Sequence, residues 1–420
     1  MLNLIGVIIG FIVILFLIRK KVNFGFSLFI GSIIIGIFSL QIITPLDIPK
    51  AMIEASIYSF EKQQIITETI ELALLMTLIF VLAKSMQETG AITKLINSLR
   101  TFFSKGGTLA VIPAVYGLMP VPGGALFSAP LIDNEGDKYR LTNNQKNFFN
   151  IWFRHVWFPI YPISSAMILI CSVNFSGIPI ERLILANFSA FLAVVIIGFV
   201  FLKRFTKNTS QGTISPKKDY HGLIFILPPV IPLLFYPLTL IGLSETRCFL
   251  FGISVSLFVL YFLLHIDIKT YLGVIKKSLT LNLVYAIFGI MILRQMMEVS
   301  QIHVLITDMM QNLAFPALLI VILIPLLLGT LTGYNLGAVA LSYPLVEPFF
   351  AFTGVQLLGL ISLIFMSSLI GYLISPIHLC NVLSSEYLKT DTTRMYKMFL
   401  PAAFSVLCIQ IIVVLLVFGQ

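Results

Sequence analysis

Residues 113–132 read Pro-Ala-Val-Tyr-Gly-Leu-Met-Pro-Val-Pro-Gly-Gly-Ala-Leu-Phe-Ser-Ala-Pro-Leu-Ile. The stretch is apolar enough to enter a bilayer, but the Pro-Val-Pro-Gly-Gly run at 120–124 would break a continuous membrane-spanning helix. We therefore predict two half-helices that meet at a tip, as a re-entrant hairpin over about residues 108–132. Unpaired backbone within a membrane must be buried in protein or line a wet cavity, so the tip is expected to mark a site.

A second stretch, residues 325–346, repeats the pattern as Pro-Leu-Leu-Leu-Gly-Thr-Leu-Thr-Gly-Tyr-Asn-Leu-Gly-Ala-Val-Ala-Leu-Ser-Tyr-Pro-Leu-Val. Pro113 and Gly117 of the first stretch match Pro325 and Gly329 of the second. The match predicts an internal duplication, with a second re-entrant hairpin over about residues 314–346. The alternative is that both stretches are ordinary membrane helices with Gly and Pro kinks.

The composition excludes a soluble globular protein. Of the 420 residues, 58% are hydrophobic and 11% are charged, and the mean hydropathy is +1.01. No compact fold of this size can hide so much apolar surface from water, so we predict an all-α polytopic protein that lies in a lipid bilayer. The formal charge of +9 does not imply a nucleic-acid partner, because basic residues gather on the cytoplasmic loops of membrane proteins. The cysteines have no metal-ligand spacing and are read as packing residues: Cys171, Cys248, Cys380 and Cys408.

About ten membrane-spanning helices are predicted. A bilayer core of about 30 Å requires roughly 20 apolar residues per helix. The segments that meet this requirement are 2–18, 24–43, 68–86, 147–172, 181–202, 222–242, 247–265, 279–297, 354–375 and 398–418. They divide the chain into two five-helix halves, 1–202 and 222–420, joined by the hydrophilic linker 203–221.

The distribution of basic residues predicts the orientation of the spans. With both termini outside the cell, 21 of the 27 Lys and Arg residues lie on cytoplasmic connections, the linker among them. An odd number of spans in each half makes the halves inverted repeats, so the two hairpins enter from opposite sides and their tips approach each other near the midplane. Short amphipathic helices at 89–104 and 299–312 are expected to lead into the hairpins.

Each hairpin is followed by a predicted span that contains residues expected to interrupt its helix. Pro159 and Pro162 fall inside Trp152–Ile170, and Gly371, Pro376 and Asn381 fall inside Ile364–Leu383. The N-terminal end of a broken helix attracts an anion, and its C-terminal carbonyls attract a cation.

The breaks define the predicted binding site. We predict that the substrate-binding residues are Pro122, Gly123, Gly124, Arg154, Ser164, Ser165, Thr330, Thr332, Tyr334, Asn335, His378 and Asn381, and that Na⁺ would bind near the backbone of Gly123, Thr332 and Asn335. The alternative for each polar residue is an interhelical hydrogen bond, and for Arg154 it is snorkelling to the interface.

The ionisable residues favour transport over other functions. None of the 18 acids lies near the middle of a span, which favours Na⁺ held by carbonyls as the coupling ion, with His155 or His378 as proton carriers if H⁺ is used instead. A cation/proton antiporter would need such an acid. We expect neither enzymatic activity nor a cofactor, because the chain carries no HExxH or GxSxG motif. A passive channel remains an alternative.

The hairpin run Pro-Val-Pro-Gly-Gly-Ala-Leu-Phe-Ser-Ala-Pro at 120–130 and the Ser-Pro-Ile-His run at 375–378 resemble those of the ion transporter superfamily, which groups gluconate, citrate, dicarboxylate and arsenite permeases. Within it, the chain looks most like a family of prokaryotic integral membrane proteins of unassigned function. The resemblance implies an elevator-type secondary transporter in the cell membrane, often a homodimer.

By position, Gly123, Gly124, Thr332 and Asn335 would hold substrate and coupling ion. The dicarboxylate branch has a Ser-Asn-Thr signature where this chain has Pro-Val-Pro-Gly and Thr-Gly-Tyr-Asn. We expect the substrate to be a small organic anion, such as a hydroxy acid or another monocarboxylate.

Overall fold

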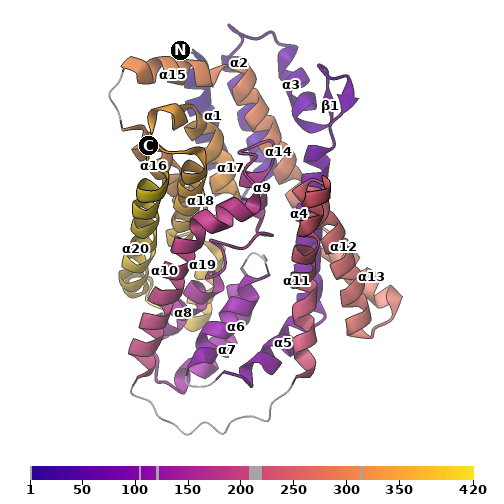
Figure 1. The fold of residues 1–420 in the computed structure, drawn as a ribbon, viewed down its shortest axis with the longest axis vertical. Coiled ribbons are helices and arrows are strands. Elements are labelled where there is room, and N and C mark those ends of the chain that lie inside the picture. The colour runs from indigo at the N-terminus through magenta and orange to yellow at the C-terminus, as the bar shows by residue number, and fades with distance from the viewer. Residues whose placement is uncertain (1, 104–105, 120–122, 208–219, 313–315) are drawn as a thin grey trace.

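The computed structural model describes residues 2–103, 106–119, 123–207, 220–312 and 316–420 (Figure 1). The first half of the chain forms α1 (Leu2–Arg19), α2 (Phe24–Phe38), α3 (Asp47–Ser56), β1 (Tyr58–Ser59), β2 (Gln64–Ile65), α4 (Glu68–Glu88), α5 (Ala91–Arg100), α6 (Gly107–Gly117), α7 (Ala125–Asp137), α8 (Asn143–Arg154), α9 (Ser165–Cys171) and α10 (Ile180–Thr206). The strands β1 and β2 are antiparallel, with Tyr58 opposite Ile65.

The second half of the chain is also helical. Its elements are η1 (His221–Ile226), α11 (Leu227–Leu234), η2 (Tyr236–Ile241), α12 (Glu245–Leu264), α13 (Ile268–Ser278), α14 (Leu281–Val299), α15 (Ile302–Asn312), α16 (Ala317–Thr332), α17 (Asn335–Val346), η3 (Glu347–Phe352), α18 (Leu357–Ile374), α19 (Leu379–Leu388) and α20 (Thr392–Phe418). Most of the predicted linker, residues 208–219, lies outside the described residues, and its first residues belong to α10.

Within the described ranges, eight helical segments are long and apolar enough to cross a membrane. They are Leu2–Arg19, Glu68–Glu88, Ile180–Thr206, His221–Ile241, Glu245–Leu264, Leu281–Val299, Leu357–Leu388 and Thr392–Phe418. Two of the ten predicted spans are not among them: α2 has 15 residues, and the predicted span 147–172 is divided between α8 and α9. The outer surfaces of the long helices are apolar, as at Leu185 (73% exposed) and Leu416 (79% exposed). Because such surfaces need a lipid environment, the chain is an all-α polytopic membrane protein.

The helices break where the Gly and Pro residues predict. α6 ends at Gly117 and α7 begins at Ala125, while α16 ends at Thr332 and α17 begins at Asn335. Residues 120–122 of the first tip lie outside the described part of the chain. Neither predicted region is therefore a continuous rod.

The breaks in the two following spans differ in part from the prediction. The first lies between α8 and α9 and contains both Pro159 and Pro162. The second lies between α18 and α19 and contains Pro376, whereas Gly371 is inside α18 and Asn381 is inside α19. A glycine in a buried helix keeps its backbone hydrogen bonds, so Gly371 does not end the helix as Pro376 does.

Glycines hold the first arm of each hairpin against the broken helix that follows it. A Cβ atom on Gly117 of α6 would lie 1.9 Å from the carbonyl oxygen of Arg154, and one on Gly329 of α16 would lie 2.5 Å from that of Ser368 in α18. The two matched glycines therefore make the same contact, in which two backbones approach directly. Such close approach is typical of helix pairs in membranes.

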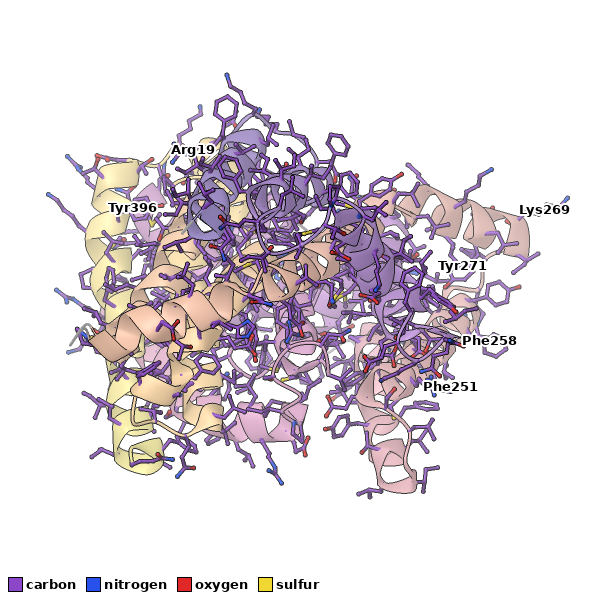
Figure 2. All side chains as sticks on the ribbon, turned by 90° about the horizontal axis from the view of Figure 1, so that it is seen from above. Arg19, Phe251, Phe258, Lys269, Tyr271 and Tyr396 are labelled. Carbon is purple, nitrogen blue, oxygen red and sulfur yellow. The ribbon has the colours of Figure 1, made fainter. Side chains whose placement is uncertain are left out.

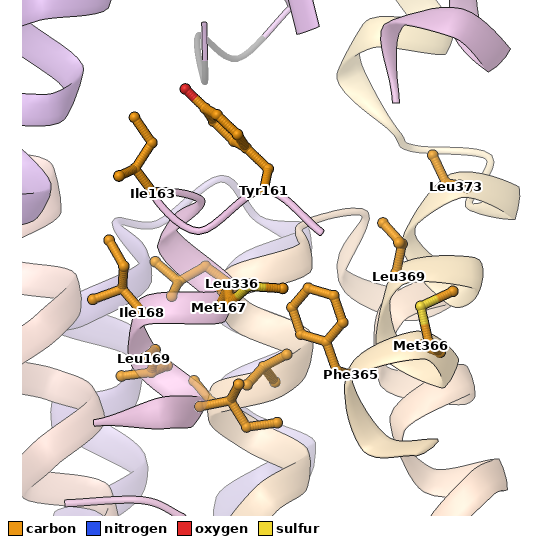
Figure 3. Close-up of a cluster of buried hydrophobic side chains, with 14 of the residues drawn as sticks. Tyr161, Ile163, Met167, Ile168, Leu169, Leu336, Phe365, Met366, Leu369 and Leu373 are labelled. Carbon is orange, nitrogen blue, oxygen red and sulfur yellow. The ribbon is translucent and has the colours of Figure 1, made fainter. Parts of the chain in front are cut away.

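Several of the remaining helices pack on one another. α2 lies against α14, and α4 lies against α12 and α14. Met167 of α9, Leu336 of α17 and Phe365 of α18 point toward one another in a buried apolar cluster (Figure 3). Seen from above, Phe251 and Phe258 of α12 lie at the side of the molecule opposite Tyr396 of α20 (Figure 2).

We predict that Gly329→Ala destabilises the protein by about 1–3 kcal/mol, because the added methyl group overlaps backbone atoms of α18. Gly273→Ala in α13 is the matched control, since a Cβ there has nothing within 4 Å. Thermal melting of both purified variants in detergent measures the difference. Equal melting temperatures would show that α16 and α18 do not approach as closely as described.

Candidate functional site

A cavity of about 560 Å³ lies between α2, α4 and α14 on one side and the hairpins and broken helices on the other. Its first wall consists of Asn23, Phe24, Met76, Ile79, Phe80, Thr280, Asn282, Leu283 and Ala286. Its second wall consists of Gly117, Met119, Gly123, Arg154, His155, Phe158, Tyr161, Ser164, Ser165, Ala166, Thr332, Gly333, Tyr334, Asn335, Leu336, Tyr372, Ile377, His378, Leu379 and Cys380. Among the described residues that line it there is no Asp or Glu.

The N-terminal ends of α7, α17 and α19 reach this cavity. Gly123 precedes α7, Tyr334 and Asn335 begin α17, and His378 and Leu379 begin α19. Within the described residues, no side chain caps any of these three ends. The first-turn amides of a helix have no partner one full turn earlier, and the dipole places positive charge at this end. At α7 the Leu126 and Phe127 amides donate to the Gly123 and Gly124 carbonyl oxygens, so this helix contributes mainly its dipole. The three ends therefore favour a negatively charged ligand.

The start of α9 is arranged differently. The Ser164 side chain caps it, because its Oγ accepts a hydrogen bond from the Met167 amide at 3.3 Å. Ser164 and Ser165 still line the cavity. Ser164 therefore both begins the helix and presents a hydroxyl to the cavity wall.

Arg154 places a fixed positive charge in the wall. It is the last residue of α8, is 3% exposed, and donates from Nη2 to the Met119 carbonyl oxygen at 3.4 Å. The guanidinium lies against Gly124, where a Cβ atom would be 2.1 Å from Nη2. Gly124 is thus required for Arg154 to lie at the start of α7. The side chain does not extend to a solvent-exposed surface, as snorkelling would require.

His155, His378 and Cys380 form a second group in the same wall. Their ligand atoms all lie within 4.8 Å of one another, and all three residues are buried. His155 Nδ1 lies 2.7 Å from the Ile151 carbonyl oxygen and Nε2 lies 3.3 Å from the Tyr372 hydroxyl. Because a carbonyl only accepts, Nδ1 carries the proton and Nε2 accepts from Tyr372. The group has the chemistry to hold a metal ion.

The opposite wall contributes an amide pair. Asn23 Nδ2 donates to Asn282 Oδ1 at 2.9 Å, and the same Asn23 caps α2. Thr280 caps α14. The sequence prediction did not include these residues, because each has the appearance of an ordinary N-cap and no break in a span points to it.

The structure brings most of the predicted binding residues together. Those that line the cavity are Gly123, Arg154, Ser164, Ser165, Thr332, Tyr334, Asn335 and His378. Gly124 lies against the Arg154 guanidinium. Pro122 lies outside the described residues. The other two predicted residues, Thr330 and Asn381, are not part of the lining.

Thr330 and Asn381 make interhelical contacts instead. The Ser375 hydroxyl donates to the Thr330 carbonyl oxygen at 2.6 Å. Asn381 Oδ1 accepts from Asn147 Nδ2 of α8 at 3.1 Å. This matches the interhelical alternative for both residues.

A buried hydrogen-bond network continues from Asn147 and links α8, α19 and α7. Ser384 Oγ donates to Asn147 Oδ1 at 2.5 Å, and Asn150 Nδ2 donates to Ser384 Oγ at 2.8 Å and to the Ala125 carbonyl oxygen at 2.9 Å. Ser128 Oγ donates to Asn150 Oδ1 at 2.6 Å. The network fixes the start of α7, and with it one edge of the cavity.

Comparison with known proteins gives a family but no activity. A family model described as "Protein of unknown function (DUF401)" matches residues 2–419. No curated protein matches the chain.

We predict that Gly124→Ala lowers stability through a clash with Arg154, because the new methyl group would lie 2.1 Å from Nη2. If so, the loss disappears when Arg154 is replaced by Ala in the same chain. A double-mutant cycle of melting temperatures tests this coupling. An equal loss in both backgrounds would contradict the placement of the guanidinium at Gly124.

Proposed function

We propose that this chain, which belongs to the DUF401 family of proteins of unknown function, is a secondary active transporter of a small organic anion. One observation carries the proposal: three uncapped helix N-termini and the buried Arg154 meet at a single cavity that no described acid lines. A cationic substrate would be repelled by this arrangement, and a neutral substrate would gain hydrogen bonds but no charge compensation. A carboxylate would gain hydrogen bonds and charge compensation.

The dimensions of the cavity suit a small carboxylic acid. A volume of about 560 Å³ is within the range of small-molecule sites, which run from roughly 300 to 1,000 Å³. Phe24, Phe80, Phe158 and Leu336 supply apolar surface beside the polar groups. A hydroxy acid or another monocarboxylate would place its carboxylate at the helix ends and its carbon chain against these rings.

The repeated order of elements supports an inverted repeat with about ten spans. The series α4 to α10 has the same sequence of long helix, short helix, hairpin, broken helix and long helix as the series α14 to α20. The matched helices α5 and α15 lie at opposite ends of the molecule (Figure 1). Opposite placement is what an inverted duplication of the kind seen in transporters would give.

The position of the cavity supports an elevator mechanism. It lies between α2, α4 and α14 and the group formed by the hairpins and broken helices. In the proposed mechanism this second group carries the bound anion past α2, α4 and α14, in the manner implied by the resemblance to the ion transporter superfamily. Nearly all polar ligand groups belong to the moving side, so the anion keeps its partners during the movement.

Na⁺ is the coupling ion that the site favours. Asn335 Oδ1 is buried and has no hydrogen-bond partner among the described residues. A hard cation takes oxygen ligands, and this oxygen is close in sequence to the C-terminal end of α16 at Thr332, where the last carbonyls carry the negative end of the helix dipole. Proton coupling through His155 or His378 is the alternative, and the transport assay below distinguishes the two.

We predict that a monocarboxylate such as lactate raises the melting temperature of the purified protein in the presence of Na⁺. A ligand at 100 times its Kd stabilises by about 2.7 kcal/mol. Lactamide, which lacks the charge, should produce no shift. Arg154→Gln should remove the shift, and Arg182→Gln, which changes an exposed arginine of α10, should retain it. If a panel of organic acids produces no shift in the unaltered protein, the anion assignment fails.

We also predict counterflow in proteoliposomes, because only a carrier exchanges labelled substrate against a gradient. Uptake should depend on Na⁺ and persist when a protonophore collapses the proton gradient. Uptake that follows pH alone would assign coupling to H⁺ instead of Na⁺. Flux without counterflow would show a passive channel.

A further inference from the structure

We propose that His155, His378 and Cys380 form a binding site for one soft metal ion, and that Cu⁺ is the ion that fits it. The three ligand atoms lie within 4.8 Å of one another in the cavity wall. Three atoms 4.8 Å apart lie about 2.8 Å from their common centre, so metal–ligand bonds of about 2.0–2.3 Å require each atom to move by under about 1 Å.

His378 is the residue that most needs a ligand. It is 1% exposed, and by distance and angle neither of its ring nitrogens has a hydrogen-bond partner among the described residues, although the neighbouring Cys380 thiol interacts with the ring. A buried nitrogen without a partner destabilises the folded protein. The ring of His378 lies 5.0 Å from that of His155 and 4.1 Å from that of Tyr372, measured between centroids. A metal ion between the two imidazoles would provide the missing bond.

His155 already has the surroundings of a metal ligand. Its Nδ1 donates to the Ile151 carbonyl oxygen at 2.7 Å, which fixes the tautomer and directs the lone pair of Nε2 toward Tyr372 and the cavity. Metal-bound histidines typically donate their second nitrogen to a carbonyl or carboxylate in this way. Only the hydrogen bond from Tyr372 would be exchanged for the metal.

Cys380 supplies the charge and the softness of the site. It lies in the first turn of α19, where the helix dipole stabilises a thiolate. A thiolate selects soft ions such as Cu⁺ and, less strictly, Zn²⁺. Cu⁺ with one thiolate and two neutral imidazoles has no net charge. Zn²⁺ would leave a net positive charge close to Arg154, the neighbour of His155, in a low-dielectric interior.

Metal binding at this site is separate from the proposed transport function and can be measured without it. The purified full-length protein is loaded with Cu⁺ under ascorbate, in competition with a chromogenic Cu⁺ chelator and without any organic acid. Retained metal is measured by mass spectrometry, and a parallel sample receives Zn²⁺. We expect about one Cu⁺ per chain, and an apparent affinity weaker by about tenfold or more in Cys380→Ser, His378→Gln and His155→Gln.

Cys408→Ser, which changes an exposed cysteine of α20, should bind Cu⁺ as the unaltered chain does. Melting temperatures of the metal-free proteins show which variants are folded, and the three separate ligand variants keep the test valid if one of them is not. Cu⁺ retention that is equal in the folded ligand variants would overturn the site. One equivalent of Zn²⁺ with no Cu⁺ would overturn the identity of the metal. Neither result depends on the organic anion or on transport.

Discussion

The structure depends on one constraint, which is that a helix broken inside a membrane exposes amides and carbonyls that lipid cannot satisfy. Within the described residues, helices break between Gly117 and Ala125 and at residues 155–164, 333–334 and 375–378, and residues beside each of these four breaks line the same cavity. Bringing the breaks together confines the unsatisfied backbone to one polar interior. The backbone groups that lose hydrogen bonds at the breaks therefore lie in one cavity, where a ligand can bind them.

The polar residues around this interior have two different tasks. Asn147, Asn150 and Ser384 bond to one another and to the backbone of α7, so they hold helices in place. Arg154 and the ends of α17 and α19 face the cavity instead. A transporter of the proposed kind needs both, because the group that moves must remain rigid while its binding surface stays open to a substrate.

The sequence predicted the breaks well because Gly and Pro act locally. A Pro-Val-Pro-Gly-Gly run breaks a helix in most surroundings, and α6 does end at Gly117 while α7 begins at Ala125. Contacts between segments that are distant in the sequence could not be predicted in this way. Asn381 follows the break at Pro376 closely in sequence. Its side chain nevertheless accepts a hydrogen bond from Asn147, which is 234 residues away. Likewise Cys380 reads as a small packing residue until folding brings His155 beside it.

The two ligands inferred for the cavity are electrostatically compatible. An anion site needs the positive charge of Arg154 and of the helix ends, and a divalent cation bound nearby would add to that charge and hold the anion too firmly for release. A Cu⁺–thiolate pair adds no net charge, so it leaves the field at Arg154 nearly unchanged while it joins α19 to the break after α8. The metal would then stabilise the group that carries the anion, since His155 and Cys380 belong to two different broken helices of that group. Bound Cu⁺ and a transported anion can therefore occupy the same wall of the cavity, because the Cu⁺–thiolate pair is neutral.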